Sequence, residues 1–389
     1  MHNTLFDFMK DENYRLMLDM ARETQDEESI ADICARFRNA DVEKLFQICE
    51  EHEFVGVAGY FAISHGLVLN DAWQTAYERE KRRLDFLKTK SREICSIMRE
   101  AGIPMVILKN GGIMQDIMPE AIQCPMEDID SLIRKKDFYR AHDILIQNGF
   151  TFKFRSEYEA EKLDEAYRDG STEYFIMTPD GEKMWFELAW RAVAGRWIRP
   201  DLEPDTDAFI EKAHCAEGTN VYVLSPEDNL LQVCIHTAKH SYVRAPGLRL
   251  HMDVDRIVTH TEIDWKLFIE KVKQTHVCKS TYLSLYIPTV LFGTQVPQWV
   301  LDELKPKHAD RLLRMLSSAG LPHPHGRKFS KLQFLRFQTA LYDGFGDMWR
   351  TLYPGKVWMQ ERYGCMNTWQ IITCVIARGL DLVGIRKKK

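Results

Sequence analysis

Residues 108–133 read LKNGGIMQDIMPEAIQCPMEDIDSLI, and this stretch decides how the rest of the chain is interpreted. Its last seven residues have the composition of a β-strand. Successive side chains of a strand point to opposite faces, so Asp128 and Asp130 project to the same side. Two carboxylates held this close repel each other unless a cation lies between them, and hard oxygen ligands suit magnesium or manganese. The pair therefore indicates a site for a divalent metal ion.

A glycine pair precedes the two aspartates. Residues 104–108 form a short apolar run of strand length, followed by Lys109, Asn110, Gly111 and Gly112 and then by a helical pattern over 113–118. The order predicts a strand, a glycine turn and the start of a helix. Backbone amides in such a turn can approach a phosphate closely, and the helix N-terminus and the lysine both favour negative charge. A phosphate site would then lie next to the metal site.

A β-hairpin is predicted further along the chain. Two alternating runs, 171–178 and 183–190, flank the turn signal Pro-Asp-Gly. In the second run Trp185, Glu187 and Ala189 share one face, and a carboxylate among so many apolar groups needs a partner. Glu187 is either a metal ligand or a glutamate that faces solvent or pairs with arginine.

Two more groups of polar residues leave alternatives open. Arg191, Arg196 and Arg199 follow the hairpin in a loop rich in tryptophan and glycine, where they either bind phosphate or are solvated charges. His236 and His240 stand one turn apart on a predicted helix, a spacing compatible with zinc. The segment lacks the glutamate of the metalloprotease motif, which makes a zinc hydrolase the weaker interpretation.

These motifs resemble the DNA polymerase β-type nucleotidyltransferase superfamily, whose signature is a glycine turn, an Asp-x-Asp strand and a third acidic residue on a later strand. More narrowly, the chain resembles the uncharacterised bacterial nucleotidyltransferases (NTP_transf_5-like). The narrower resemblance rests on four further segments, which are 187–190, 224–228, 236–240 and 358–364. It covers about residues 90–365, which is most of the chain.

The resemblance implies an α+β fold, with a polymerase β-like mixed sheet and flanking helices between N-terminal and C-terminal helical regions. It implies transfer of a nucleoside monophosphate from a nucleoside triphosphate such as ATP to a hydroxyl acceptor, with release of pyrophosphate. The catalytic carboxylates Asp128, Asp130 and Glu187 would hold Mg²⁺ or Mn²⁺, with Glu187 as the base. The residues expected to bind the nucleotide or its phosphates are Lys109, Gly111, Gly112, Arg191, His236, His240, Arg249 and Asp253.

Three positions depart from the family pattern. Asn110 stands where glycine is usual, Cys124 where arginine is frequent, and Ala189 where histidine is common. None of the three is an expected metal ligand. The departures support an alternative function, that of a relative that binds a nucleotide or a protein partner without turnover.

Composition and charge limit the class of acceptor substrate and the cellular compartment that we expect for this protein. The chain has 389 residues, of which 45% are hydrophobic and 28% charged, as in ordinary soluble proteins. Its formal net charge of -5 makes nucleic acid an unlikely partner and favours a small-molecule, peptide or protein acceptor. The nine cysteines form no Cys-x-x-Cys pair, so we expect reduced thiols and a cytoplasmic location. The N-terminal residues show no signal peptide.

Helical periodicity divides the chain into three parts. Residues 1–100 read as a helical region that ends in a long charged helix over about 70–101, residues 101–224 as the catalytic core, and residues 225–389 as a C-terminal helical domain. No apolar run is long enough to span a bilayer. Residues 369–385 form an amphipathic closing helix with a basic tail, which is either solvated or attaches weakly to an anionic membrane surface.

Overall fold

The computed structural model describes residues 4–156, 161–193, 198–240, 247–322, 329–364 and 367–382. Its centre is one seven-stranded mixed sheet with the strand order β3-β4-β5-β2-β1-β7-β6. Helices account for 64% of the structure and flank this sheet, so the expected α+β fold is confirmed. The strands are β1 (Met105–Ile107), β2 (Asp128–Ile133), β3 (Thr151–Phe152), β4 (Ser171–Met177), β5 (Lys183–Ala189), β6 (His214–Cys215) and β7 (Tyr222–Val223).

The middle of the sheet combines both strand directions. β2 runs antiparallel to β1 and parallel to β5, while β4 and β5 form the predicted antiparallel hairpin. Buried residues alternate along β5, with Met184, Phe186 and Leu188 on the covered face. The face that carries Glu187 is therefore the other one, opposite the apolar core.

Helices form the whole N-terminal part, as predicted. Aspartate or asparagine caps α1, α2, α3 and α5 by accepting a backbone N–H, which satisfies amides that the helix leaves without partners. The helices are η1 (Thr4–Lys10), α1 (Glu12–Met20), α2 (Glu27–Asn39), α3 (Val42–Glu51), α4 (Val55–Ser64) and α5 (Asp71–Glu100). The last has 30 residues and contacts β1 and β2, so it supports the centre of the sheet.

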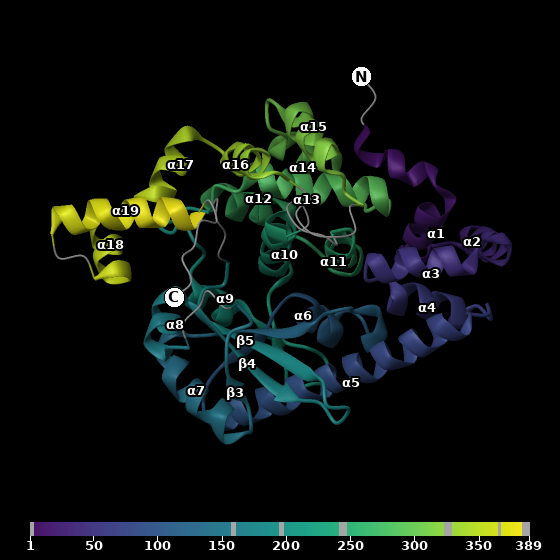
Figure 1. The fold of residues 1–389 in the computed structure, drawn as a ribbon, viewed down its shortest axis with the longest axis horizontal. Coiled ribbons are helices and arrows are strands. Elements are labelled where there is room, and N and C mark those ends of the chain that lie inside the picture. The colour runs from purple at the N-terminus through teal and green to yellow at the C-terminus, as the bar shows by residue number, and fades with distance from the viewer. Residues whose placement is uncertain are drawn as a thin grey trace.

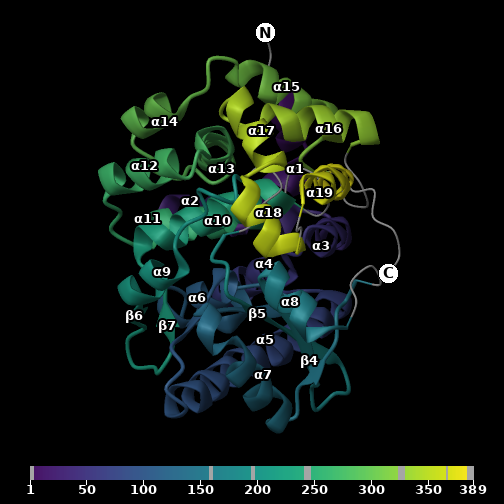
Figure 2. The same cartoon turned by 90° about the vertical axis from the view of Figure 1, so that its left-hand side faces the viewer.

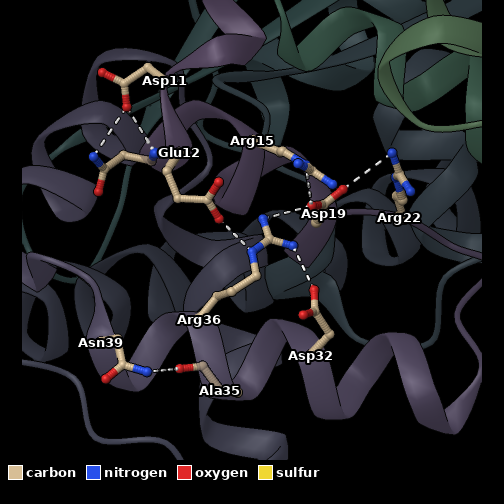
Figure 3. A network of polar contacts seen from close by, with 10 residues as sticks. Asp11, Glu12, Arg15, Asp19, Arg22, Asp32, Ala35, Arg36 and Asn39 are labelled. Carbon is tan, nitrogen blue, oxygen red and sulfur yellow. Dashed lines mark hydrogen bonds and ion pairs between the residues drawn. The ribbon is translucent and has the colours of Figure 1, made fainter.

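An arginine holds the first two helices together. The Arg36 guanidinium donates to Asp19 at 2.9 Å, to Asp32 at 3.0 Å and to Glu12 at 2.5 Å (Figure 3). Asp19 is almost fully buried, so the charge on Arg36 offsets the cost of burying that carboxylate. This network is structural and lies within the N-terminal helices.

Short helices connect the strands of the sheet. They are α6 (Lys109–Asp116), η2 (Ala121–Gln123), η3 (Lys135–Asp137), α7 (Phe138–Gln147), α8 (Leu163–Asp169) and α9 (Thr206–Lys212). One expectation was wrong in detail, because Gly111 and Gly112 do not form a turn before the helix. They lie inside α6, which begins two residues earlier.

The C-terminal half is helical and lies above the sheet in Figures 1 and 2. Its helices are α10 (Pro226–His240), α11 (Arg249–His260), α12 (Trp265–Gln274), α13 (Cys278–Leu291), α14 (Gln298–Leu304), α15 (Ala309–Ala319), α16 (Lys331–Ala340), α17 (Phe345–Leu352), α18 (Lys356–Tyr363) and α19 (Thr368–Leu382). α10 packs against α11, α12 and α13 and also contacts α6, so it joins this half to the sheet. Within the described ranges, no helix has both the length and the apolar character needed to cross a membrane.

Candidate active site

Three carboxylates lie side by side on two adjacent strands. Asp130 of β2 is the direct partner of Glu187 of β5, and Asp128 is opposite Trp185. Residues paired in register project to the same face, so the two aspartates and Glu187 face the same side. On the far side of β5, Glu173 of β4 is opposite Glu187 and extends the acidic row. The chain thus brings together the three residues that the sequence indicated.

Lys109 places a positive charge against this row. It is the first residue of α6, it has a positive φ of 53°, and its Nζ donates to Oδ1 of Asp130 at 2.5 Å. A positive φ is uncommon for a residue with a side chain, and here it turns the chain from β1 into the helix. Burial lowers the pKa of Lys109, but Asp130, Glu187 and Asp128 raise it by more, so the ammonium stays charged.

A second cation, Arg155, closes the other end of the row. Its Nη2 donates to Asp128 at 2.6 Å and to Glu173 at 2.9 Å, and its guanidinium lies over the ring of Trp185. Arg155 follows the short strand β3, whose pairing with β4 brings it to Glu173. No motif marked this residue in the sequence, because its position depends on that pairing.

Asp130 and Glu187 share a hydrogen bond and have opposite pKa shifts. Burial raises the pKa of Asp130 well above its ordinary value, assisted by the negative charges of Asp128 and Glu187. For Glu187 burial acts in the same direction, but Lys109, the hydrogen bond from Asp130 and Lys239 lower its pKa below the ordinary value. The two shifts therefore favour the proton on Asp130 and the ionised form of Glu187.

The donor set fits a hard divalent cation. Carboxylate oxygens are the ligands that Mg²⁺ and Mn²⁺ prefer, and this row offers them from two adjacent strands. Among the residues that the structure describes, no three His, Cys, Asp or Glu side chains are already arranged around a common metal position. Lys109 and Arg155 instead occupy carboxylate oxygens, so a metal would have to displace them.

The glycines of α6 allow the helix to approach β1. A Cβ on Gly112 would lie 2.8 Å from the carbonyl oxygen of Ile107, and one on Gly111 would lie 2.8 Å from the Ile107 side chain. Real Cβ atoms do not approach other atoms so closely, so both positions need glycine for packing. The first turn of α6, with its free amides, is thereby held beside the carboxylate row.

The end of α10 contributes three cationic or titratable residues. The rings of His236 and His240 lie 4.7 Å apart, and burial, with Lys109, His240, Lys239 and Arg249, lowers the pKa of His236. The Lys239 residue is exposed by its surface area, but desolvation of its ammonium by the surrounding protein lowers its pKa, while Glu187 and Asp130 oppose that shift. These interactions with Glu187 and Asp130 relate Lys239 to the carboxylate row. Lys239 stands three residues after His236, a spacing that puts both side chains on one helix face. This spacing could have identified Lys239 as a site residue from the sequence.

Two other expected phosphate ligands have protein partners. Arg191 forms an ion pair with Glu203, donates to the carbonyl oxygen of Asp169 at 3.2 Å and packs its side chain against Gly170. Arg199, further along the same loop, pairs with acidic residues on either side of it, Asp201 and Asp347. Arg196 lies outside the described residues. Phosphate binding by Arg191 stays a prediction that would require release of Glu203.

Arg249 and Asp253 lie behind the site, inside the protein. Asp253 is 1% exposed and accepts a hydrogen bond from Asn110 at 3.2 Å, and burial raises its pKa to about 6. Arg249 pairs with Glu53 and donates to the carbonyl oxygen of Pro125 at 2.5 Å. These contacts link α11 to α6 and to the N-terminal helices, and thus hold the start of α6 in place.

Two of the departures belong to the same buried region. The Asn110 side chain donates to the carbonyl oxygen of Pro125 at 3.0 Å as well as to Asp253. Cys124 is fully buried near Arg256 and Asp253, and burial raises the pKa of its thiol to about 12. Both residues contribute to packing behind the carboxylates and leave the acidic row intact.

Comparison with known families agrees with this geometry. The sequence model of a family described as uncharacterised nucleotidyltransferase matches residues 38–293, which include β1, β2, β5 and α10. The chain belongs to this nucleotidyltransferase family. No curated protein matches it. The matched residues of this nucleotidyltransferase contain the whole carboxylate row, Lys109 and the α10 cluster, whereas α14–α19 lie beyond the match.

Proposed function

We propose that this nucleotidyltransferase is metal-dependent and transfers a nucleoside monophosphate from ATP or another nucleoside triphosphate to a hydroxyl group, releasing pyrophosphate. One observation carries the proposal. Asp128, Asp130 and Glu187 face the same side from two paired strands, and Lys109 at the start of α6 contacts Asp130. Carboxylates, a lysine and helix amides are the groups that a triphosphate with its metal ions requires.

Asp128, Asp130 and Glu187 would hold Mg²⁺ or Mn²⁺. When bound, the metal would lower the pKa of the acceptor hydroxyl and neutralise charge on the leaving pyrophosphate. Lys109 and Arg155 would then give up their carboxylate partners, and both cations could bind phosphate oxygens. The present ion pairs thus keep the acidic row compensated when no metal is bound.

The residues of the site have separate roles in the transfer. Glu187, the ionised member of the hydrogen-bonded pair, accepts the proton of the acceptor hydroxyl. That oxygen attacks the α-phosphorus in line, and the bond to the pyrophosphate oxygen breaks. Lys109 and Lys239 place positive charge where negative charge develops on the phosphates.

The acceptor is a small molecule, a peptide or a protein that presents a hydroxyl group. The formal net charge of -5 disfavours nucleic acid, which binds through broad basic surfaces. A cytoplasmic protein with reduced thiols and access to nucleoside triphosphates fits this chemistry.

A second function is favoured by the ion pairs themselves. Lys109 and Arg155 already neutralise Asp130 and Asp128, as in a protein that retains the fold and binds a nucleotide or a partner without turnover. Ala189, where relatives often have histidine, lies on the Glu187 face of β5 and removes one polar group there.

The test incubates the purified protein with Mg²⁺ or Mn²⁺ and each α-labelled nucleoside triphosphate, with and without cell extract. Asp130→Asn keeps the size of the side chain and removes its charge, and Asp180→Asn in the exposed hairpin turn is the matched control. Label transfer that Asp130→Asn abolishes and Asp180→Asn retains supports the transferase. Nucleotide binding without transfer in any extract supports the second function, and absence of both binding and transfer would reject both.

A further inference from the structure

The C-terminal segment, residues 331–389, has a charge opposite to that of the whole chain. It contains ten Lys and Arg residues against four Asp and Glu residues, a formal net charge of +6, whereas the chain carries -5. Four of the basic residues are the last four of the sequence, Arg-Lys-Lys-Lys. Such an asymmetry indicates an anionic partner for this segment alone.

The last described helix, α19, exposes an apolar stripe. Its inner side is fixed to the protein, because Ile371 is buried and Arg378 donates to the carbonyl oxygen of Thr351 at 2.6 Å and lies over the Trp358 ring. On the outer side the exposed large apolar residues follow one another at spacings of three, four and four. This stripe consists of Trp369 (79% exposed), Ile372, Ile376 (59% exposed) and Leu380.

The neighbouring helices also expose large apolar side chains. α17 and α18 pack against α19, and Figure 1 shows the three in yellow at one end of the molecule. Phe345 and Trp349 of α17 and Val357 of α18 are largely exposed. Arg350 and Lys356, next to them in the sequence, are also exposed. Large apolar side chains and cations therefore alternate on one group of helices.

We propose that α17–α19, which belong to this basic segment, bind peripherally to an anionic membrane surface. Helices of this kind lie in the lipid headgroup region, with the apolar side chains inserted and the cations near the phosphates. Tryptophan is enriched at that depth, and each lysine or arginine adds attraction to anionic lipid. The surface lies outside residues 38–293 and is independent of the proposed transfer reaction.

Charge and exposed apolar area together favour this partner over two others. A second copy of the chain bound through the same surface would bring two segments of charge +6 face to face, which is repulsive. A nucleic acid would match the charge but would leave the aliphatic stripe of Ile372, Ile376 and Leu380 in water. An anionic bilayer satisfies both features.

The experiment is co-sedimentation of the full chain with vesicles of phosphatidylglycerol or of phosphatidylcholine. We expect binding to the anionic vesicles that raised salt weakens, and little binding to the neutral ones. The double variant Ile372→Asp and Ile376→Asp should reduce the vesicle-bound fraction by about tenfold or more. Replacing the last three lysines by glutamine should reduce affinity by about fivefold for each charge removed.

The matched control is Ile146→Asp, whose side chain on α7 is 42% exposed against 46% for Ile372. It should bind vesicles like the wild type, and circular dichroism should show all variants folded. Failure of the wild type to bind anionic vesicles, or equal binding by the double variant, would overturn the proposal. So would a wild-type dimer that Ile376→Asp dissociates, or binding of RNA in place of vesicles.

Discussion

Asp130 and Glu187 are direct partners across the parallel strands β2 and β5, and a hydrogen bond joins their carboxyl groups. Burial beside two other negative charges raises the pKa of Asp130 and so favours its protonated form. A carboxylate binds a metal ion in its ionised form. We therefore expect a metal ion at this site to compete with a proton on Asp130.

The affinity for Mn²⁺ should consequently rise with pH. The pKa of Asp130 is raised, so protons compete with the metal ion at every pH below that raised pKa. Below it, the affinity for Mn²⁺ should increase by up to about tenfold per pH unit. Titration calorimetry in two buffers of different ionisation enthalpy would measure the released proton. Asp130→Asn should remove that release, and a flat pH profile for the wild type would contradict the shared proton.

Arg155 competes with a metal ion for Asp128, so Arg155→Gln should tighten Mn²⁺ binding. The Arg155 side chain is partly exposed, and pairs of this kind contribute roughly 0.5–1 kcal/mol, which corresponds to about a twofold to fivefold change. Arg168→Gln is the control, because Arg168 is exposed and donates to the backbone carbonyl of Asp164 on its own helix. Weaker Mn²⁺ binding in Arg155→Gln would show that the arginine supports the metal site.

Lys239→Met should weaken binding of nucleoside triphosphate by about tenfold to a hundredfold, the range for a charge-assisted hydrogen bond. The loss should be much smaller for the nucleoside, which has no phosphates. Lys266→Met on α12, also exposed, is the control and should leave both affinities unchanged. Equal losses for nucleoside and triphosphate would instead place Lys239 against the base or the sugar.

Local patterns predicted most of the fold. The helix over 70–101 was confirmed as α5, capped by Asn70, with Trp73 and Leu84 buried on its inner side. The hairpin was confirmed as β4 and β5, because its alternation and its turn are short-range signals. The helix start in α6 was placed too late, since glycine usually marks a turn, and here close packing against Ile107 requires it within a helix. The three-part domain division stays a prediction.

The sequence predicted only some of the residues of the candidate site. Alternation identified Asp128, Asp130 and Glu187 as residues on defined strand faces, and pairing in register then brought them together. The position of Arg155 and the burial of Asp253 depend on contacts between elements that are far apart in the sequence. No spacing of neighbouring residues indicates such contacts. Asp253 accepts a hydrogen bond from Asn110 of α6 in the buried interior, and its expected place in the nucleotide cleft stays a prediction.

Gly112→Ala tests whether the glycine pair serves packing. The new methyl group would lie 2.8 Å from the carbonyl oxygen of Ile107, a backbone atom that cannot move without disturbing β1. We expect a loss of about 1–3 kcal/mol in the free energy of unfolding, measured by chemical denaturation. Gly346→Ala is the control, because it also lies in a helix but a Cβ there meets no atom within 4 Å, and alanine favours helix. Unchanged stability in Gly112→Ala with lost nucleotide affinity would mean that the glycine is needed for phosphate and not for packing.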